Sequence, residues 1–242
     1  MSALRLFLAV AAACCASFLA SCAGGSSAGR DALGHRPGPK GFRTVVIDAG
    51  HGGHDSGAIS PVTRQREKDL ALDVAQRVRT HLGGSFRVVL VRSGDAFVAL
   101  DRRADLASRS GAGALVSIHF NAGPSRLRGP ETFYWRVDSY SLAKRLQQQL
   151  AAVSPAESGN RGLVRRRIRL TRNPQIPCVL VECGYLTNPA EARLCADPRY
   201  RDRLARAIAA GIREQSTHGD AGMGPLPRPL SAPPSRATDP RE

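Results

Sequence analysis

The sequence predicts one α/β domain, with a mostly parallel, mixed sheet that helices flank on both faces. Short apolar runs typical of buried strands alternate along the chain with stretches in which apolar residues recur every four positions, as in amphipathic helices. Such alternation favours a parallel sheet, because parallel strands need a crossover connection and a helix usually supplies it. The 242 residues suffice for one catalytic domain with an extension at each end.

The first half of the domain is predicted to contain three strands and two helices. Apolar runs at residues 42–48, 86–91 and 114–119 indicate the strands. One helix begins near Glu67, and another covers residues 100–110. The apolar face of the first helix consists of residues spaced four apart, Leu70, Val74, Val78 and Leu82.

The second half continues the pattern with two more strands, at residues 132–137 and 178–183. Asn188, Pro189 and Glu191 fit the cap, the first position and the third position of a short helix. Four-residue spacing marks two further helices, through Leu142, Leu146 and Leu150 and through Leu204, Ile208 and Ile212.

The N-terminus, residues 1–22, has the composition of an export signal. Arg5 precedes an apolar stretch that is too short to be trusted as a spanning helix. The stretch ends in Leu-Ala-Ser-Cys, which resembles the lipobox of bacterial lipoproteins and makes Cys22 the lipid-bearing first residue of the mature chain. An ordinary cleaved secretory signal is the alternative. Either signal predicts an exported protein of the cell envelope or periplasm, and the lipobox adds a membrane anchor.

Two segments flank the expected catalytic domain, residues 42–216. Residues 23–41 are rich in Gly, Ser, Ala, Pro and charge without an apolar period, which indicates a flexible tether. Residues 217–242 are rich in proline and are expected to form a disordered tail.

The chain is basic, with 35 Lys and Arg against 20 Asp and Glu and a formal net charge of +15. A solvated basic surface explains this excess most simply. We expect no nucleic-acid partner, because the N-terminus indicates export.

Three cysteines remain after the leader, Cys178, Cys183 and Cys195. Cys178 and Cys183 lie five positions apart in one extended run, so their side chains face opposite sides of the sheet and should not pair. Buried free thiols are the expected state of all three, with a Cys183–Cys195 bridge left open.

Four residues with metal-binding or proton-transfer chemistry lie at strand ends or at a helix start: His51, Glu67, His119 and Glu182. Ligands gather beyond the carboxyl ends of parallel strands, where these side chains are expected. Glu182 closes the apolar run Val179 to Val181, where a carboxylate is costly unless a cation or donors compensate it. Two imidazoles and one carboxylate can hold a metal with one open position, and a second carboxylate can handle protons.

These segments resemble the zinc-dependent N-acetylmuramoyl-L-alanine amidases of the Amidase_3 family, over about residues 44–212. The matching motifs are VVIDAGHGGHDSGA, Glu67-Lys68-Asp69, Ser117-Ile118-His119 and VLVECGYLTNP, in that order. The resemblance implies one zinc ion held by His51, Glu67 and His119, with Glu182 as the catalytic carboxylate. It also implies peptidoglycan as the substrate, cleaved at the amide between N-acetylmuramic acid and the L-alanine of the stem peptide.

Other residues of these motifs have weaker assignments. His54 is a rival metal ligand, although the family does not use this position, and we expect it to line the cleft or face solvent. Asp48 either orients a ligating imidazole or bonds local backbone N–H groups. Asn121 either donates to substrate or serves a turn, and Phe120 is expected to reshape the substrate groove.

The segment RGLVRRRIRLTR places Arg165, Arg167 and Arg169 on one face if it is extended. A solvated strand face is the simpler interpretation. Contact of Arg165 and Arg167 with the peptide carboxylates of the wall is the sharper alternative.

Two other functions stay open at this point. A zinc peptidase that cuts within stem peptides would use the same metal chemistry, and a catalytically inactive wall-binding lipoprotein would use the fold alone. The presence of all four key residues favours an enzyme. Whether an activator protein opens the site is also open.

Overall fold

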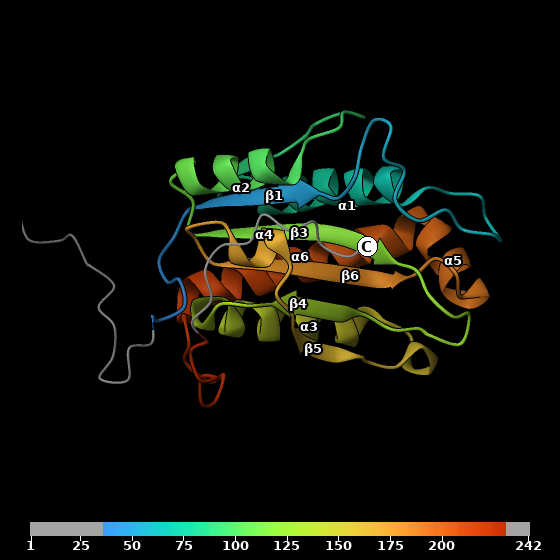
Figure 1. Cartoon of the computed structure of the whole chain (residues 1–242). Helices are drawn as coiled ribbons and strands as arrows, with labels where there is room; N and C mark the ends of the chain where they lie inside the picture. The colour runs from blue at the N-terminus through green and yellow to red at the C-terminus, as the bar shows by residue number, and fades with distance from the viewer. Residues whose placement is uncertain (1–35, 231–242) are drawn as a thin grey trace, which may run out of the picture.

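A computed structural model describes residues 36–230, which form a six-stranded sheet with the strand order β2-β1-β3-β6-β4-β5. Figure 1 shows this sheet between helices, with β3 and β6 at its centre. The strands are β1 (Thr44–Ala49), β2 (Arg87–Leu90), β3 (Ala114–Asn121), β4 (Glu131–Tyr134), β5 (Gly162–Arg165) and β6 (Cys178–Tyr185).

The sheet is mixed, as the sequence predicts. β2, β1, β3 and β6 are mutually parallel, whereas β4 runs antiparallel to β6, and β5 runs parallel to β4. We call the end where β1, β3 and β6 finish the carboxyl edge, and the end where they begin the amino edge. Because of the reversal, β4 and β5 begin at the carboxyl edge and finish at the amino edge.

Helices cover both faces of the sheet (Figure 1). The α-helices are α1 (Glu67–Leu82), α2 (Leu100–Arg109), α3 (Tyr140–Val153), α4 (Arg169–Arg172), α5 (Pro189–Ala196) and α6 (Pro198–His218), and the 3₁₀ turns are η1 (Val137–Ser139) and η2 (Ala156–Ser158). The main core joins α1, α3 and α6 to one face, where Val45 and Ile47 of β1 point. Val46 points to the other face, beside Ala107 of α2. Successive strand residues therefore serve two different cores, as the period of two requires.

The helix that the sequence predicts near Glu67 begins at that residue, and the predicted cap Asn188 accepts hydrogen bonds from the backbone N–H groups of Ala190 and Glu191. The predicted strand 132–137 is shorter, because the 3₁₀ turn η1 begins at Val137. Cys178, Cys183 and Cys195 are free and buried, which confirms that expectation.

The boundaries expected for the tether and the tail are wrong where the structure describes them. α6 continues to His218, and the backbone carbonyls of Gly219 and Ala221 then accept hydrogen bonds from Arg145 of α3. Before the sheet, Gly38 donates to Asp220 and Gly41 donates to the carbonyl of Ser216. The described parts of both segments, residues 36–41 and 217–230, thus pack against the domain at its amino edge.

Cys22 and the rest of the leader lie outside residues 36–230. Within the part of the chain that the structure describes, none of the helices has the length and apolarity needed to cross a bilayer.

Candidate metal centre and active site

Three of the four key residues converge at the carboxyl edge. His51 follows β1, His119 lies near the end of β3, and Glu67 opens α1. Oε1 of Glu67 lies 3.1 Å from Nε2 of His51 and 2.9 Å from Nδ1 of His119. One potential ligand atom from each residue lies within 4.8 Å of the other two. Residues far apart in the sequence therefore present two imidazole nitrogens and one carboxylate oxygen to a common point.

The Glu67 carboxylate is positioned by backbone donors from two other segments. Oε1 accepts a hydrogen bond from the N–H of Phe120 at 3.0 Å, and Oε2 accepts one from the N–H of Ala58 at 2.9 Å. Burial raises the pKa of Glu67, but the hydrogen bonds from His119 and His51 outweigh it, and the net pKa lies well below the usual value for glutamate. Glu67 is therefore an ionised, pre-positioned acceptor for a cation.

His51 is held by a partner that the sequence analysis missed. Its Nδ1 lies 2.9 Å from Oδ2 of Asp55, four residues further along the same loop. Burial lowers the pKa of His51 and the hydrogen bond to Glu67 raises it, and with the contribution of Asp55 the net pKa lies above its ordinary value. Asp55 leaves Nε2 as the nitrogen that faces Glu67, and such a partner fixes the orientation of a metal-binding imidazole.

Two glycines allow the His51 loop to come this close. A Cβ atom on Gly50 would lie 2.3 Å from Cε1 of His119. Gly57 has φ +60°, and a Cβ atom there would lie 2.6 Å from both Oε2 of Glu67 and the His51 ring. Only glycine fits at these two positions, because any side chain there would collide with the candidate ligands.

Two buried arginines clamp the backbone of the same loop. Arg92 donates to the carbonyls of Ala49 and Gly50, and Arg103 donates to those of Ala49 and His51. The bond from Arg103 to the His51 carbonyl is 2.7 Å, and His51 itself has φ 56°, a region that residues other than glycine rarely adopt. The arginines thus hold the candidate metal ligand His51 in a strained backbone conformation.

Asp48 has neither of the roles expected for it. Its carboxylate is fully buried, 2.6 Å from Nη1 of Arg103, and it accepts a hydrogen bond from the Ser117 hydroxyl at 2.7 Å. It therefore neutralises the buried guanidinium of Arg103, and it supports the His51 loop through that arginine. The acid that contacts an imidazole is Asp55 instead.

Glu182 lies beside this cluster on the neighbouring strand. In the sheet it is the register partner of His119 on β3 and of Glu131 on β4. Register partners project from the same face, so His119, Glu182 and Glu131 form a row across three strands. Glu182 is 6% exposed, which places a carboxylate next to the ligand cluster and largely out of water.

Glu131 extends the polar row away from the cluster. It accepts a hydrogen bond from the Tyr185 hydroxyl at 3.2 Å, and Arg161 lies 3.4 Å from its carboxylate. Nδ2 of Asn121 donates to Oε2 of Glu131 at 3.4 Å, while its Oδ1 accepts from the N–H of Ala122 at 2.8 Å. Asn121 therefore serves a turn, and donation to substrate stays a prediction.

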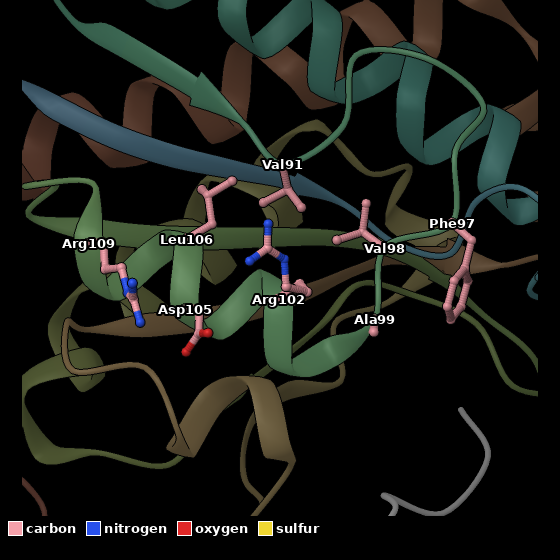
Figure 2. Close-up of a pocket in the computed structure, with 8 residues that line it drawn as sticks. All are labelled: Val91, Phe97, Val98, Ala99, Arg102, Asp105, Leu106 and Arg109. Atoms are coloured by element: carbon pink, nitrogen blue, oxygen red, sulfur yellow. The ribbon is translucent and has the colours of Figure 1, made fainter.

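His54 lies away from the three ligands. It is exposed and stacks on Phe97, with ring centroids 4.2 Å apart. Phe97 borders a pocket of about 510 Å³ between the loop after β2 and the outer face of α2, which Figure 2 shows. The residues that line the pocket are Val91, Phe97, Val98, Ala99, Arg102, Asp105, Leu106 and Arg109, none of which belongs to the ligand cluster.

Phe120 does not shape the groove as expected. It is fully buried in the core under α1 and α6, because it follows His119 by one residue and therefore points to the opposite face of β3. The alternation of side chains along a strand would have predicted this position.

Arg165 and Arg167 lie far from the cluster, so any contact of theirs with the wall carboxylates would lie outside the active site and stays a prediction. Arg165 ends β5 at the amino edge, three residues along the strand from the row of Glu182, or about 10 Å away. Arg169 does not share their face either, because it opens α4. The arginine that reaches the polar row is Arg161, at the start of the same basic segment.

The model of the N-acetylmuramoyl-L-alanine amidase family, Amidase_3, matches residues 45–214. The chain is 37% identical over 172 residues to the N-acetylmuramoyl-L-alanine amidase LytC of Bacillus subtilis, a match that covers 69% of this chain and 34% of LytC. The chain therefore spans about a third of the length of that relative.

Solved structures match the domain more completely. An N-acetylmuramoyl-L-alanine amidase from Clostridium difficile 630 superposes with a TM-score of 0.68 at 34% identity, over 73% of this chain and 97% of that one. The CwlD amidase from Clostridioides difficile, solved in complex with the GerS lipoprotein, gives 0.67 at 33% identity, over 71% and 97%. The motifs, the fold and the matched length agree, and the chain belongs to the Amidase_3 family of N-acetylmuramoyl-L-alanine amidases.

Proposed function

We propose that the protein is a zinc-dependent peptidoglycan hydrolase that cleaves the amide between N-acetylmuramic acid and the L-alanine of the stem peptide. The observation that carries this proposal is the convergence of His51, Glu67 and His119 on one point beside Glu182. Membership of the amidase family supports the choice of bond.

The three ligand residues fit zinc. Two imidazole nitrogens and one carboxylate oxygen are a common donor set of catalytic zinc sites, which keep a further position for water or substrate. His119 and Glu67 are each 4% exposed, so the site is shielded while one side remains accessible through the partly exposed His51. A zinc ion bound there supplies Lewis-acid activation of water and of the scissile carbonyl.

Glu182 is assigned the proton transfers. Its carboxylate takes a proton from the attacking water, whose oxygen forms the new bond to the lactyl carbonyl carbon of N-acetylmuramic acid. The same carboxyl group then returns the proton to the alanine nitrogen as the C–N bond breaks, so the peptide leaves with a free amine. Its position next to His119 in the sheet supports this role.

Substrate contacts are assigned to the row beyond Glu182. Asn121 borders this row, and Arg161 has a half-exposed guanidinium next to Glu131. An arginine there suits the carboxylates of a stem peptide, because the guanidinium can bind a carboxylate through two hydrogen bonds. Arg161 thus replaces Arg165 and Arg167 as the basic group proposed to contact the peptide.

Digestion of purified peptidoglycan tests the proposal, with the wild type compared with Glu182→Gln and the products identified by mass spectrometry. The wild type should release intact stem peptides with a free N-terminal alanine and leave intact glycan strands. Glu182→Gln should lower this rate by about 10²- to 10⁴-fold, the usual contribution of a general acid–base group. Fragments cut within the stem peptides would establish the peptidase alternative, and no fragments from a zinc-loaded chain would establish the inactive wall-binding alternative.

The rest of the chain is proposed to place this domain at a membrane. Residues 1–22 act as a lipoprotein signal that ends in the acylated Cys22, and the following segment through residue 35 links the anchor to the domain. The protein is accordingly exported to the cell envelope or periplasm. Replacing Cys22 with Ser should release it from membranes, whereas unchanged membrane association would reject the anchor.

A protein partner is a further proposal. The related CwlD amidase was solved in complex with a lipoprotein, GerS. By this likeness an activator could contact the present domain as well. A pull-down from envelope extracts, followed by measurement of zinc affinity with and without the captured protein, would test it.

A further inference from the structure

We propose that the amino edge of the domain is a docking surface for anionic phospholipid headgroups, which turns the active centre away from the bilayer and toward the wall. This inference uses the exported, membrane-anchored location proposed above, but it does not depend on the amidase activity. The proposed partner of this surface is a lipid bilayer.

Within the described part of the chain, exposed acidic side chains are missing from the amino edge, whereas exposed basic side chains occur at both edges. Among residues 36–230, exposed acidic side chains lie at the carboxyl edge or on the first half of α2: Asp69, Asp95, Asp101, Asp105, Glu157 and Asp197. Exposed basic side chains at the amino edge come from the starts of β1 and β2, the ends of α1, α2 and α6, and the segments after β5 and α6: Lys40, Arg43, Arg79, Arg87, Arg109, Arg166, Arg167, Arg213 and Arg228.

Hydrogen bonds join these basic residues into one surface. Arg43 and Arg87 are adjacent, because the N–H of Arg87 donates to the carbonyl of Arg43 at 2.8 Å. Arg213 of α6 donates to the carbonyl of His81 in the last turn of α1, next to Arg79. The basic residues at the sheet start and at the helix ends are therefore neighbours.

The segment after α6 carries the surface toward β5. The carbonyl of Gly219 accepts from Arg145 of α3, and the carbonyl of Arg228 accepts from Arg165 at the end of β5. Arg166 and Arg167 follow Arg165 directly and are exposed.

Partly buried acids at this edge are already engaged. Glu214 accepts a hydrogen bond from Gln149, and Asp220 accepts one from the N–H of Gly38. Asp138 is buried against Arg136. The exposed charge of the amino edge is therefore positive.

Helix dipoles explain only part of this distribution. Cations are favoured at helix C-termini, which accounts for Arg79, Arg109 and Arg213. Arg43 and Arg87 lie at the starts of strands, and Arg166 lies in a loop, where no helix dipole favours a cation. A uniformly basic surface does not explain the distribution either, because the exposed acids are confined to the other end and α2.

The chain leaves the domain at this same edge. Figure 1 shows the described N-terminal segment at the end of the sheet where β1 and β3 begin, away from α5 and the strand ends that carry the site. Arg36 lies fourteen positions after Cys22 in the sequence, so the anchor lies at most about 50 Å from the domain. A basic surface held this close to anionic lipids gains attraction from each Lys or Arg that comes within a Debye length.

Sedimentation with lipid vesicles tests the docking surface without the anchor. The chain from Ala23 to Glu242 is mixed with vesicles of phosphatidylcholine alone or of equal parts phosphatidylcholine and phosphatidylglycerol. The test variant carries Arg43→Glu, Arg79→Glu and Arg87→Glu. A control variant of the same net charge carries Arg126→Glu, Arg193→Glu and Arg199→Glu, which are exposed at the carboxyl edge.

The wild type and the control variant should bind the phosphatidylglycerol vesicles, less tightly as salt rises, and should not bind phosphatidylcholine alone. The test variant should lose about a hundredfold in partitioning, because each lost cation contributes roughly fivefold. Equal losses in both variants would show a net-charge effect and overturn the proposal, as would a wild type that does not bind.

Binding to insoluble peptidoglycan tests whether wall polymers, rather than a bilayer, are the partner of this surface. If the test variant lost wall binding while keeping vesicle binding, the surface would belong to wall polymers and the proposal would be overturned. Thermal unfolding and cleavage of soluble muropeptides should be unchanged in the test variant, because its substitutions are exposed and far from Glu182. Failure of the amidase proposal would leave the vesicle result unaffected, so the two failures are distinguishable.

Discussion

One oxygen of Glu67 faces both histidines: Oε1 lies 2.9 Å from Nδ1 of His119 and 3.1 Å from Nε2 of His51. The same oxygen accepts a hydrogen bond from the backbone N–H of Phe120. A backbone donor thus fixes the carboxylate between the two imidazoles. The domain has a candidate metal site whose geometry is set by its own strands.

Glu67→Gln should remove metal binding while keeping the fold. The amide has almost the same shape and its oxygen can still accept from either Phe120 or Ala58, but it lacks the negative charge that a cation requires. Loss of a residue that only orients a metal ligand lowers affinity by about 10- to 100-fold. Loss of a ligand itself should lower the zinc affinity, measured by calorimetry, by more than that. The exposed neighbour Asp69→Asn should leave affinity unchanged, and a Glu67→Gln chain with full zinc affinity would exclude Glu67 as a ligand.

Zinc affinity should fall as the pH falls. The pKa of His51 lies above the ordinary 6.5, so in acid the imidazole is protonated and zinc must displace that proton. Binding should therefore weaken by up to about tenfold per pH unit for each proton released once the pH drops below the His51 pKa. Calorimetric titrations between about pH 5.5 and pH 8 check this. If the zinc affinity stayed the same over that range, His51 would bind zinc without losing a proton.

Gly50→Ala should damage the metal site, because its Cβ atom would lie 2.3 Å from the His119 ring. Relief of the clash requires the ring or the loop to move, and overpacking of this kind costs about 1–3 kcal/mol of unfolding free energy. Thermal unfolding and zinc titration measure the two effects. Gly94→Ala is the matched control, since its Cβ atom would meet nothing within 4 Å. Equal behaviour of the two variants would show that Gly50 does not constrain the site.

Arg103→Gln should destabilise the domain strongly. It leaves Asp48 fully buried without its charged partner and removes donors from the carbonyls of Ala49 and His51. Breaking a buried pair in this way costs about 3–5 kcal/mol. Urea unfolding should show this loss, whereas Arg102→Gln, an exposed neighbour on α2, should be nearly neutral. A small effect at Arg103 would mean that the clamp on the His51 loop contributes little.

The ligand cluster could be predicted from the sequence because each member has a local signal. His51 and His119 end apolar strands, and Glu67 opens a helix with a clear apolar face. Parallel strands bring such ends together, so topology alone makes these residues neighbours. Asp55 could have been found by the same reasoning, since it lies in the His51 loop.

The misplaced arginines show what apolar runs cannot reveal. The run that forms β4 does not show its direction, and its antiparallel pairing with β6 sends Arg165 to the amino edge and brings Arg161 to the carboxyl edge. Arg92 and Arg103 were missed for another reason. An arginine in a helix or loop is usually exposed, and only tertiary packing shows that these two are buried on backbone carbonyls.

Zinc dependence of amide cleavage tests the central claim most directly. The chain is stripped with a chelator, zinc is added back in steps, and release of stem peptides from peptidoglycan is measured at each step. Activity should be absent after stripping and should rise with zinc until each chain holds one ion. Undiminished cleavage by a chain shown to hold no metal would contradict the account.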